Sequence, residues 1–155
     1  MDVNQQKSLN EIKFSVSMCV YKNDNPEHFR QAIESIINQS LKPDEIILVV
    51  DGPIPLSIDS IIRLYETEDY FKVIRLSENV GHGNARRTGL ENCTYELVAL
   101  MDADDISMPD RFEKQVKCFK EDNSLSIVGG NINEFIDTTD NVVGVRAVPQ
   151  EDAEI

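Results

Sequence analysis

Three aspartates that follow an apolar segment suggest cation chemistry. Residues 97–101 are all apolar, and Asp102, Asp104 and Asp105 follow within four positions. Carboxylates crowded at the end of a buried strand repel one another unless a cation neutralises them. Mg²⁺ takes one or two protein carboxylates and completes its coordination shell with water and phosphate oxygens. The segment therefore predicts a divalent cation shared with a phosphorylated ligand; a solvated acidic loop is the simpler alternative.

Two other uses of closely spaced aspartates fit this sequence less well. In a calcium-binding EF-hand loop that starts at Asp102, Glu113 would stand at the twelfth position. However, Ile106 and Ser107 occupy the fifth and sixth positions, where that loop needs a ligand and a glycine. A phosphatase of the Asp-x-Asp type would carry its aspartates after the first strand, which here ends in residues 19–21.

The elements that would position these carboxylates follow from the spacing of apolar residues. Expected strands cover residues 14–21, 46–50, 73–76, 97–101 and 126–136, the last with a bulge at 129–130. Expected helices cover residues 26–37, 57–65, 84–92 and 109–121. Strict alternation of strands and helices predicts an α/β fold in which right-handed crossovers place helices on both faces of a parallel sheet. Such sheets bind ligands at the carboxyl ends of their strands.

Four strand ends carry residues suited to ligand binding. Tyr21, Asp51, residues 77–81 and residues 102–105 each follow an expected strand. Asp51 precedes a glycine, so on its own it is better explained as a turn residue. The convergence of four such segments on one edge of the sheet is a much stronger indication of a site than any single segment.

Residues 79–89 are rich in glycine and lead into an expected helix. Their glycine spacing differs from the dinucleotide-binding fingerprint. Backbone N–H groups at a helix start attract anions, and the guanidinium of Arg86 suits a diphosphate. The alternatives are a surface ion pair for Arg86 and simple solvation for His82.

Composition excludes several classes of function. The 155 residues include 15 Lys and Arg against 28 Asp and Glu, and the formal charge of −13 argues against nucleic-acid polymers and anionic lipid surfaces as partners. Cys19, Cys93 and Cys118 form no disulfide framework or zinc motif, which predicts a reducing compartment. Residues 1–12 do not resemble a signal peptide, and no membrane segment is expected. We therefore expect a cytoplasmic protein, with the cytoplasmic face of a membrane as one possible site of action.

The chain resembles the nucleotide-sugar-binding, amino-terminal part of family 2 glycosyltransferases, which have the Rossmann-like GT-A fold. The resemblance covers residues 14–136. The segments that carry it are residues 15–21, 31–40, 45–52, 79–89 and 100–115. Their order and spacing match the family, which implies a mostly parallel sheet that binds a nucleotide-sugar donor.

The resemblance also implies a role for each candidate site residue. Tyr21 would lie against the base, Asp51 would hydrogen-bond that base, and Arg86 would lie near the diphosphate. Asp102 and Asp104 match the family's Asp-x-Asp signature, which reaches the ribose and a Mg²⁺ or Mn²⁺ cofactor.

Within that signature, Asp104 is the expected direct ligand of the cation, and Asp105 would lie near the donor sugar. Two residues depart from the family pattern: Arg87 stands where Asn is common, and Pro53 where Ser is common. Both departures are expected to affect donor contacts.

The implied reaction is the inverting transfer of a sugar, from a UDP-sugar or a similar donor, to a hydroxyl of a glycan or lipid-linked acceptor. The family's catalytic base and acceptor site lie further along the sequence, so the base is expected beyond Ile155. We expect a polar lead-in at residues 1–13, a donor-binding domain at 14–137 and the start of the acceptor-binding half at 138–155. On this interpretation the chain is a fragment that is inactive alone.

Two alternatives to this function remain open at the level of sequence. One is a non-catalytic module that holds a nucleotide or metal without turnover. The other is a sugar nucleotidyltransferase, which fits less well because that class usually carries a basic glycine-rich loop after the first strand. Residues 22–25 contain no glycine.

Overall fold

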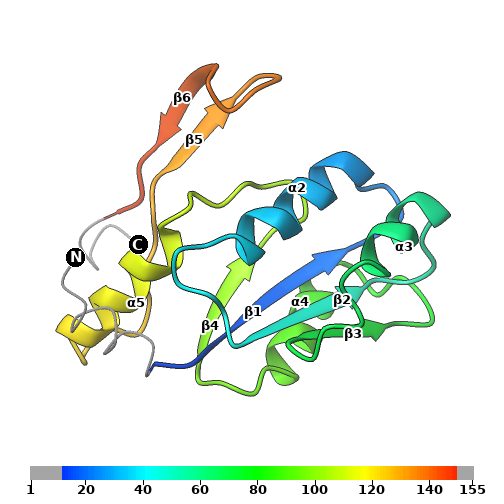
Figure 1. Ribbon diagram of the computed structural model, residues 1–155, viewed down its shortest axis with the longest axis horizontal. Helices are drawn as coiled ribbons and strands as arrows, with labels where there is room; N and C mark the ends of the chain where they lie inside the picture. The colour runs from blue at the N-terminus through cyan, green and yellow to red at the C-terminus, as the bar shows by residue number, and fades with distance from the viewer. Residues whose placement is uncertain (1–11, 150–155) are drawn as a thin grey trace. The chain divides into compact units, whose positions relative to one another are not determined.

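A four-stranded parallel sheet organises the amino-terminal part of the chain (Figure 1). The computed structural model describes residues 12–149. The parallel strands are β1 (Phe14–Val20), β2 (Glu45–Val50), β3 (Phe71–Arg75) and β4 (Leu97–Met101). Their order is β3-β2-β1-β4, so the chain runs outward from β1 to β3 and then returns to place β4 on the other side of β1. This reversal creates a crevice at the carboxyl ends of β1 and β4, the usual ligand position in such sheets.

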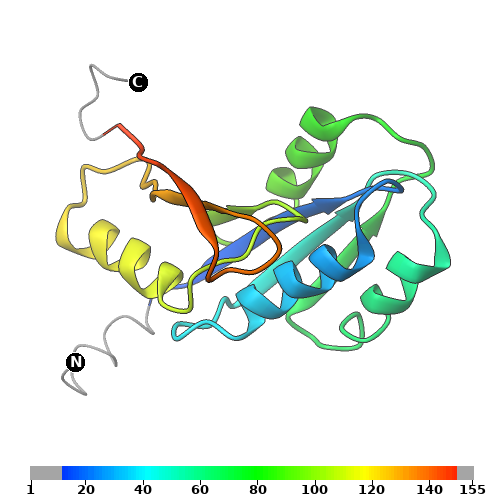
Figure 2. The same ribbon diagram turned by 90° about the horizontal axis from the view of Figure 1, so that it is seen from above.

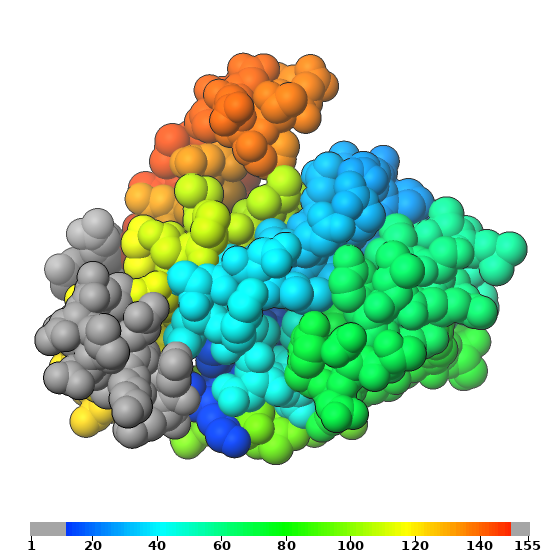
Figure 3. Space-filling view, viewed as in Figure 1, coloured from blue at the N-terminus to red at the C-terminus, as the bar shows by residue number. Residues whose placement is uncertain are grey.

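Helices cover both faces of the sheet, which confirms the expectation from the alternating elements (Figure 2). They are α2 (Pro26–Ile37), α3 (Leu56–Ile62), α4 (His82–Glu91) and α5 (Arg111–Glu121). α2 and α3 contact each other on one face, and α4 packs against β1 and β2 from the other. In the space-filling view, the light blue and green segments that contain α2 and α3 form much of the visible face (Figure 3).

The start of α2 shows how local sequence fixes an element near the site. The side-chain oxygen of Asn25 accepts hydrogen bonds from the backbone N–H groups of Glu27 and His28, and Pro26 follows as the first helical residue. Both features stabilise a helix start. The helix then buries one stripe of side chains, namely Phe29, Ala32, Ile33 and Ile36. Because this face is fixed to the core, the turn between β1 and α2 is held at both ends.

The large apolar side chains of β1 lie on one face of the sheet and its small side chains on the other. The large ones belong to the main core cluster and are Phe14, Val16, Met18 and Val20. Successive strand residues point to opposite faces, so Ser15, Ser17 and Cys19 lie on the face covered by α4. Gly89 of α4 approaches this face so closely that a methyl group on it would lie 2.3 Å from Ser17 Oγ. The small side chains of β1 are therefore what allows α4 to pack tightly on the sheet.

Replacing Gly89 by alanine is expected to lower the free energy of unfolding by about 1–3 kcal/mol, the usual cost of overpacking a core. The Ser17 hydroxyl is buried and has no hydrogen-bond partner within the described residues. Ser17→Ala removes the clashing oxygen without breaking a hydrogen bond, so the Ser17→Ala/Gly89→Ala double variant should regain wild-type stability. Urea unfolding of the three variants measures this coupling. A double variant as unstable as Gly89→Ala alone would contradict the packing account.

One sequence expectation about the sheet is wrong. Residues 126–136 were expected to form a further strand of the parallel sheet, but only β5 (Ile132–Phe135) is a strand, and it pairs antiparallel with β6 (Val142–Arg146). Glycines weaken strands, and the pair at 129–130 precedes β5 instead of forming the expected bulge. The irregularity in pairing lies at Glu134 and Phe135. Asp137, with a φ of 64°, lies in the connection between the two strands. β5 therefore pairs with β6, the next strand in the sequence, and not with a strand of the parallel sheet.

The contacts divide the chain into two compact units. The described residues up to Val116 form the first, and those from Lys117 onward form the second. Every candidate site residue lies in the first unit. The expected lead-in at residues 1–13 falls almost entirely outside the described residues, and the expected boundary near residue 137 stays a prediction.

Candidate functional site

The carboxyl ends of the parallel strands surround a cavity of about 460 Å³. Its lining residues come from β1, from the loops that follow β1 to β4, and from α4; they are Cys19, Val20, Tyr21, Asp24, Asp51, Asn79, Gly81, His82, Ala85, Asp102, Ala103 and Asp104. A cavity of this size holds a small organic ligand. The expectation that four strand ends converge on one site is thus supported by geometry.

Tyr21 is held at the mouth of the cavity by a closed turn. Its backbone N–H donates to the Asp24 carboxylate at 2.9 Å, and the Asp24 N–H donates back to the Tyr21 carbonyl at 3.2 Å. The Tyr21 side chain remains 39% exposed, so its ring is available to a ligand. Burial raises the pKa of Asp24, the hydrogen bond from Tyr21 opposes this, and the nearby charge of Asp104 raises the pKa further. Two carboxylates therefore face the same part of the cavity.

Asp51 fixes the loop that follows β3. Its buried carboxylate accepts hydrogen bonds from Val80 N at 2.7 Å, Gly81 N at 3.1 Å and the Asn79 side chain at 3.0 Å. Gly52 adopts a φ of 84°, and a side chain there would lie 2.6 Å from Asn79 N, so only glycine fits this close approach. A carboxylate offers about four acceptor positions, so Asp51 retains about one for a ligand.

Arg86 and Asp102 form an ion pair beside the cavity, between α4 and the end of β4. Both side chains remain partly exposed. Cys19 lies close to this pair, and burial raises the pKa of its thiol to about 11, while the Arg86 charge opposes the shift and the Asp51 and Asp102 charges favour it. The thiol is therefore protonated near neutral pH and lines the cavity without acting as a nucleophile.

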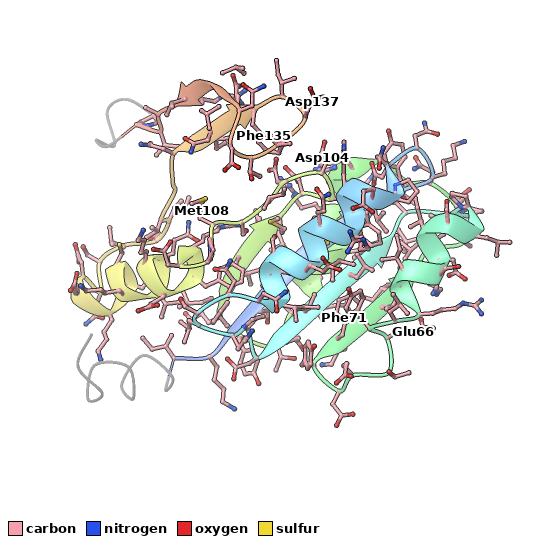
Figure 4. The ribbon with its side chains drawn as sticks, turned by 45° about the horizontal axis from the view of Figure 1, so that its top comes forward. Glu66, Phe71, Asp104, Met108, Phe135 and Asp137 are labelled. Carbon is pink, nitrogen blue, oxygen red and sulfur yellow. The ribbon has the colours of Figure 1, made fainter. Side chains whose placement is uncertain are left out.

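Asp104 lies on the exposed loop that leaves β4, as Figure 4 shows. Phe71, which is labelled in the same view, is the first residue of β3. Asp105 is exposed and lies next to Asp104, and its charge interacts with that of Arg111. The structure therefore brings Tyr21, Asp51, Asp102 and Asp104 around one cavity and joins Arg86 to it through Asp102. Asp105 is not among the residues that line this cavity.

Comparison with known protein families identifies the family of the chain. The model of glycosyl transferase family 2 matches residues 15–151. The chain belongs to this family. A crystal structure of *S. aureus* TarS 1-349 aligns with 90% of the chain and 39% of that protein, with a TM-score of 0.65. At 23% identity this likeness supports the fold alone, and it confirms the expected GT-A architecture.

Curated relatives share more of the sequence. An uncharacterized glycosyltransferase of *Haemophilus influenzae* is 40% identical over 93% of the chain and 54% of its own length. The amylovoran biosynthesis glycosyltransferase AmsE of *Erwinia amylovora* is 38% identical over 79% of the chain and 46% of its length. A UDP-Gal:alpha-D-GlcNAc-diphosphoundecaprenol beta-1,3-galactosyltransferase of *Escherichia coli* is 32% identical over 79% of the chain and 45% of its length. The chain therefore spans about half the length of these family 2 relatives.

The side chains at the cavity suit a cation that is shared with a ligand. Among residues 12–149, no three His, Cys, Asp or Glu side chains are grouped to enclose a metal ion. Asp102 and Asp104 nevertheless both line the cavity, and their side chains carry carboxylate oxygens. Mg²⁺ is commonly held by one or two carboxylates and the phosphates of a substrate. The donor set therefore fits the expected Mg²⁺ or Mn²⁺.

The structure gives a part in this cavity to two residues that received no individual role from the sequence. Asp24 closes the turn below Tyr21, and Asn79 joins Asp51 to the next loop. Asp24 could have been found from its position between a strand end and a helix cap, where aspartate commonly bonds to nearby backbone. The contact of Asn79 with Asp51 spans 28 residues of sequence and had no local signal.

Proposed function

We propose that the cavity binds the nucleotide diphosphate of a sugar donor and that the protein transfers this sugar to an acceptor hydroxyl. The observation that carries the proposal is the presence of Asp102 and Asp104 in the lining of the cavity, with Arg86 of α4 paired to Asp102 beside it. A diphosphate needs cationic partners, and carboxylates beside it are favourable only when a metal ion intervenes. Membership of family 2 supports the same assignment.

The base end of the donor would lie between Tyr21 and Asp51. The Tyr21 ring offers an apolar face, and the remaining acceptor position of Asp51 can receive an N–H group of the base. The three hydrogen bonds that Asp51 already accepts keep its carboxylate fixed before the ligand arrives. This preorganisation reduces the entropic cost of binding.

The diphosphate would lie near the amino end of α4, where no side chain caps the helix. Free N–H groups at that end and the Arg86 guanidinium both favour an anion. Asp104 and Asp102 would hold Mg²⁺ or Mn²⁺, which when bound neutralises the negative charge that develops on the departing diphosphate.

The finer assignment is a UDP-sugar donor, a glycan or lipid-linked acceptor, and inversion at the anomeric carbon. Two of the relatives, named for amylovoran biosynthesis and for transfer from UDP-Gal to a diphosphoundecaprenol-linked sugar, support such partners. The base that deprotonates the acceptor would lie in the half of the relatives' length that these 155 residues do not match.

We further propose that the protein acts in the cytoplasm, at the membrane face where lipid-linked acceptors are presented. All three cysteines are free thiols, which suits a reducing compartment. In the described part of the chain, no helix combines the length and apolar character needed to cross a bilayer.

Calorimetric titration of the 155-residue chain with UDP tests the donor assignment. We expect saturable binding that tightens on addition of Mn²⁺ and is displaced by a UDP-sugar, with GDP as the comparison. We expect no glycosylated product with the same chain, because loss of base help alone costs about 10²–10⁴-fold in rate. Metal-independent binding would contradict the proposed cation site, and rapid acceptor glycosylation would show that the base lies within these residues.

A further inference from the structure

Arg111, the first residue of α5, closes the loop that carries the aspartates. Its guanidinium donates to the Leu100 carbonyl at 2.9 Å and to Ser107 Oγ at 2.9 Å. It also donates to Gln115 Oε1 at 3.1 Å and approaches the Met101 sulfur at 3.4 Å. Residues 100 and 107 bracket the whole acidic segment, so one side chain ties its beginning to its end.

The far end of the same loop is anchored on α2 and the residues after it. Ser107 N donates to Ser35 Oγ at 3.0 Å, and the buried Gln39 side chain donates to the Met108 carbonyl at 2.7 Å while accepting from Phe112 N at 3.1 Å. The yellow-green loop lies against the light blue helix in Figure 3. Residues 107 and 108 are therefore fixed to the core. Arg111 links them to the end of β4, because it hydrogen-bonds both Ser107 and the Leu100 carbonyl.

The charge of Arg111 also acts on the acidic segment. Burial lowers the pKa of Arg111, and the charges of Asp105 and Asp102 oppose this shift, so both carboxylates attract the guanidinium. Arg86 pairs with Asp102 as well. The acidic loop is thus held by two arginines, one on α4 and one on α5, while Asp104 remains exposed toward the cavity.

We propose that Arg111 is a positioning residue that closes the acidic loop and holds Asp102 and Asp104 ready for the cation and diphosphate of the donor. The inference rests on the proposed donor site. A guanidinium presents several donors in a rigid fork, and a lysine ammonium does not reproduce this geometry. Binding sites depend on such supporting residues, and removal of one typically weakens metal affinity by about 10–100-fold.

The test compares Arg111→Lys, which keeps the charge, with Arg111→Gln, which removes it. Arg63→Lys is the matched control, since Arg63 lies at the end of α3 and pairs with Asp59 away from the cavity. Two quantities are measured: amide hydrogen exchange of residues 101–108 without ligand, and the ratio of UDP affinities with and without Mn²⁺. If Arg111→Gln does not fold, Ser107→Ala replaces it in the test, because it removes one hydrogen-bond acceptor of the Arg111 guanidinium.

We expect exchange in residues 101–108 to accelerate at least ~10-fold in Arg111→Gln and less in Arg111→Lys. The Mn²⁺ enhancement of UDP affinity should fall by ~10-fold or more, while affinity without metal stays within ~2-fold. Arg63→Lys should change neither quantity. Unchanged exchange would overturn the inference, as would equal losses with and without metal. If wild-type chain shows no Mn²⁺ enhancement, the proposed function fails, and the exchange measurement still decides whether Arg111 orders the loop.

Discussion

Replacing Asp104 by asparagine is expected to remove most of the Mn²⁺-dependent part of UDP binding. The substitution keeps the size of the side chain but removes the charge from one of the two cavity carboxylates, Asp102 and Asp104, that we propose as cation ligands. We expect affinity in the presence of Mn²⁺ to fall about 100-fold, which corresponds to about 2.8 kcal/mol. Affinity measured in EDTA should change little, because Tyr21 and Asp51 are untouched. Calorimetric titration under both conditions measures the difference.

The matched control for this prediction is Asp110→Asn. This substitution is the same acid-to-amide change, six residues further along the chain. Asp110 pairs with Lys114 and does not line the cavity. Its substitution should leave both affinities within about twofold, as most surface changes shift free energies by no more than about 0.5 kcal/mol. If Asp104→Asn binds UDP and Mn²⁺ as tightly as the control does, Asp104 is not a metal ligand.

The second large effect concerns Glu45, a buried carboxylate at the amino end of β2. It accepts hydrogen bonds from Ser15 Oγ at 2.7 Å, Lys72 Nζ at 2.6 Å, and both the backbone N–H and hydroxyl of Thr94 at 2.7 Å. These partners lie on β1, on β3 and on the turn before β4. Glu45→Gln replaces one acceptor oxygen by a donor and removes the charge, so we expect stability to fall by about 3 kcal/mol. Urea unfolding at neutral pH measures this loss.

The same network predicts an acid-sensitive stability. Burial raises the pKa of Glu45, but hydrogen bonds from Lys72, Thr94 and Ser15 outweigh it and lower the pKa from 4.5 to about 2. A depressed pKa means that the folded state binds fewer protons than the unfolded state between these values. The stabilisation is therefore complete above pH 4.5 and is lost as the pH falls toward 2. Unfolding free energies measured from pH 6 to pH 2.5 should show this loss.

Glu45→Gln should flatten that pH dependence, since glutamine does not titrate. Glu91→Gln is the control, because the Glu91 carboxylate is exposed and pairs with Arg87 on the surface of α4. Equal pH profiles for wild type and Glu45→Gln would show that other carboxyl groups dominate acid unfolding.

The parallel sheet and its ligand-binding edge could be predicted from sequence because local apolar patterns determine them. Residues 97–101 form β4 as expected, and the continuous apolar run at residues 46–50 lies within the fully buried β2. Each polar residue that follows such a strand is automatically placed at the same edge. Tyr21, Asp51 and Asp102 were found for this reason.

The details that sequence reasoning missed all depend on contacts between distant segments. Asp51 was expected either to contact the base or to serve as a turn residue, whereas in the structure its carboxylate holds the loop of Val80 and Gly81. The position of β5 depends on its pairing with β6, and apolar content alone did not distinguish a hairpin strand from a sheet strand. Arg111 received no role of its own from the sequence, because the carbonyl that it binds lies eleven residues earlier.

The most direct test of the donor-site assignment is a crystal structure of the protein with UDP and Mn²⁺, with the cation located by its anomalous scattering. We expect one anomalous peak in contact with the Asp104 carboxylate and the diphosphate oxygens, with the base beside Tyr21 and Asp51. A nucleotide bound elsewhere on the protein, or a cation that contacts neither Asp102 nor Asp104, would contradict the account.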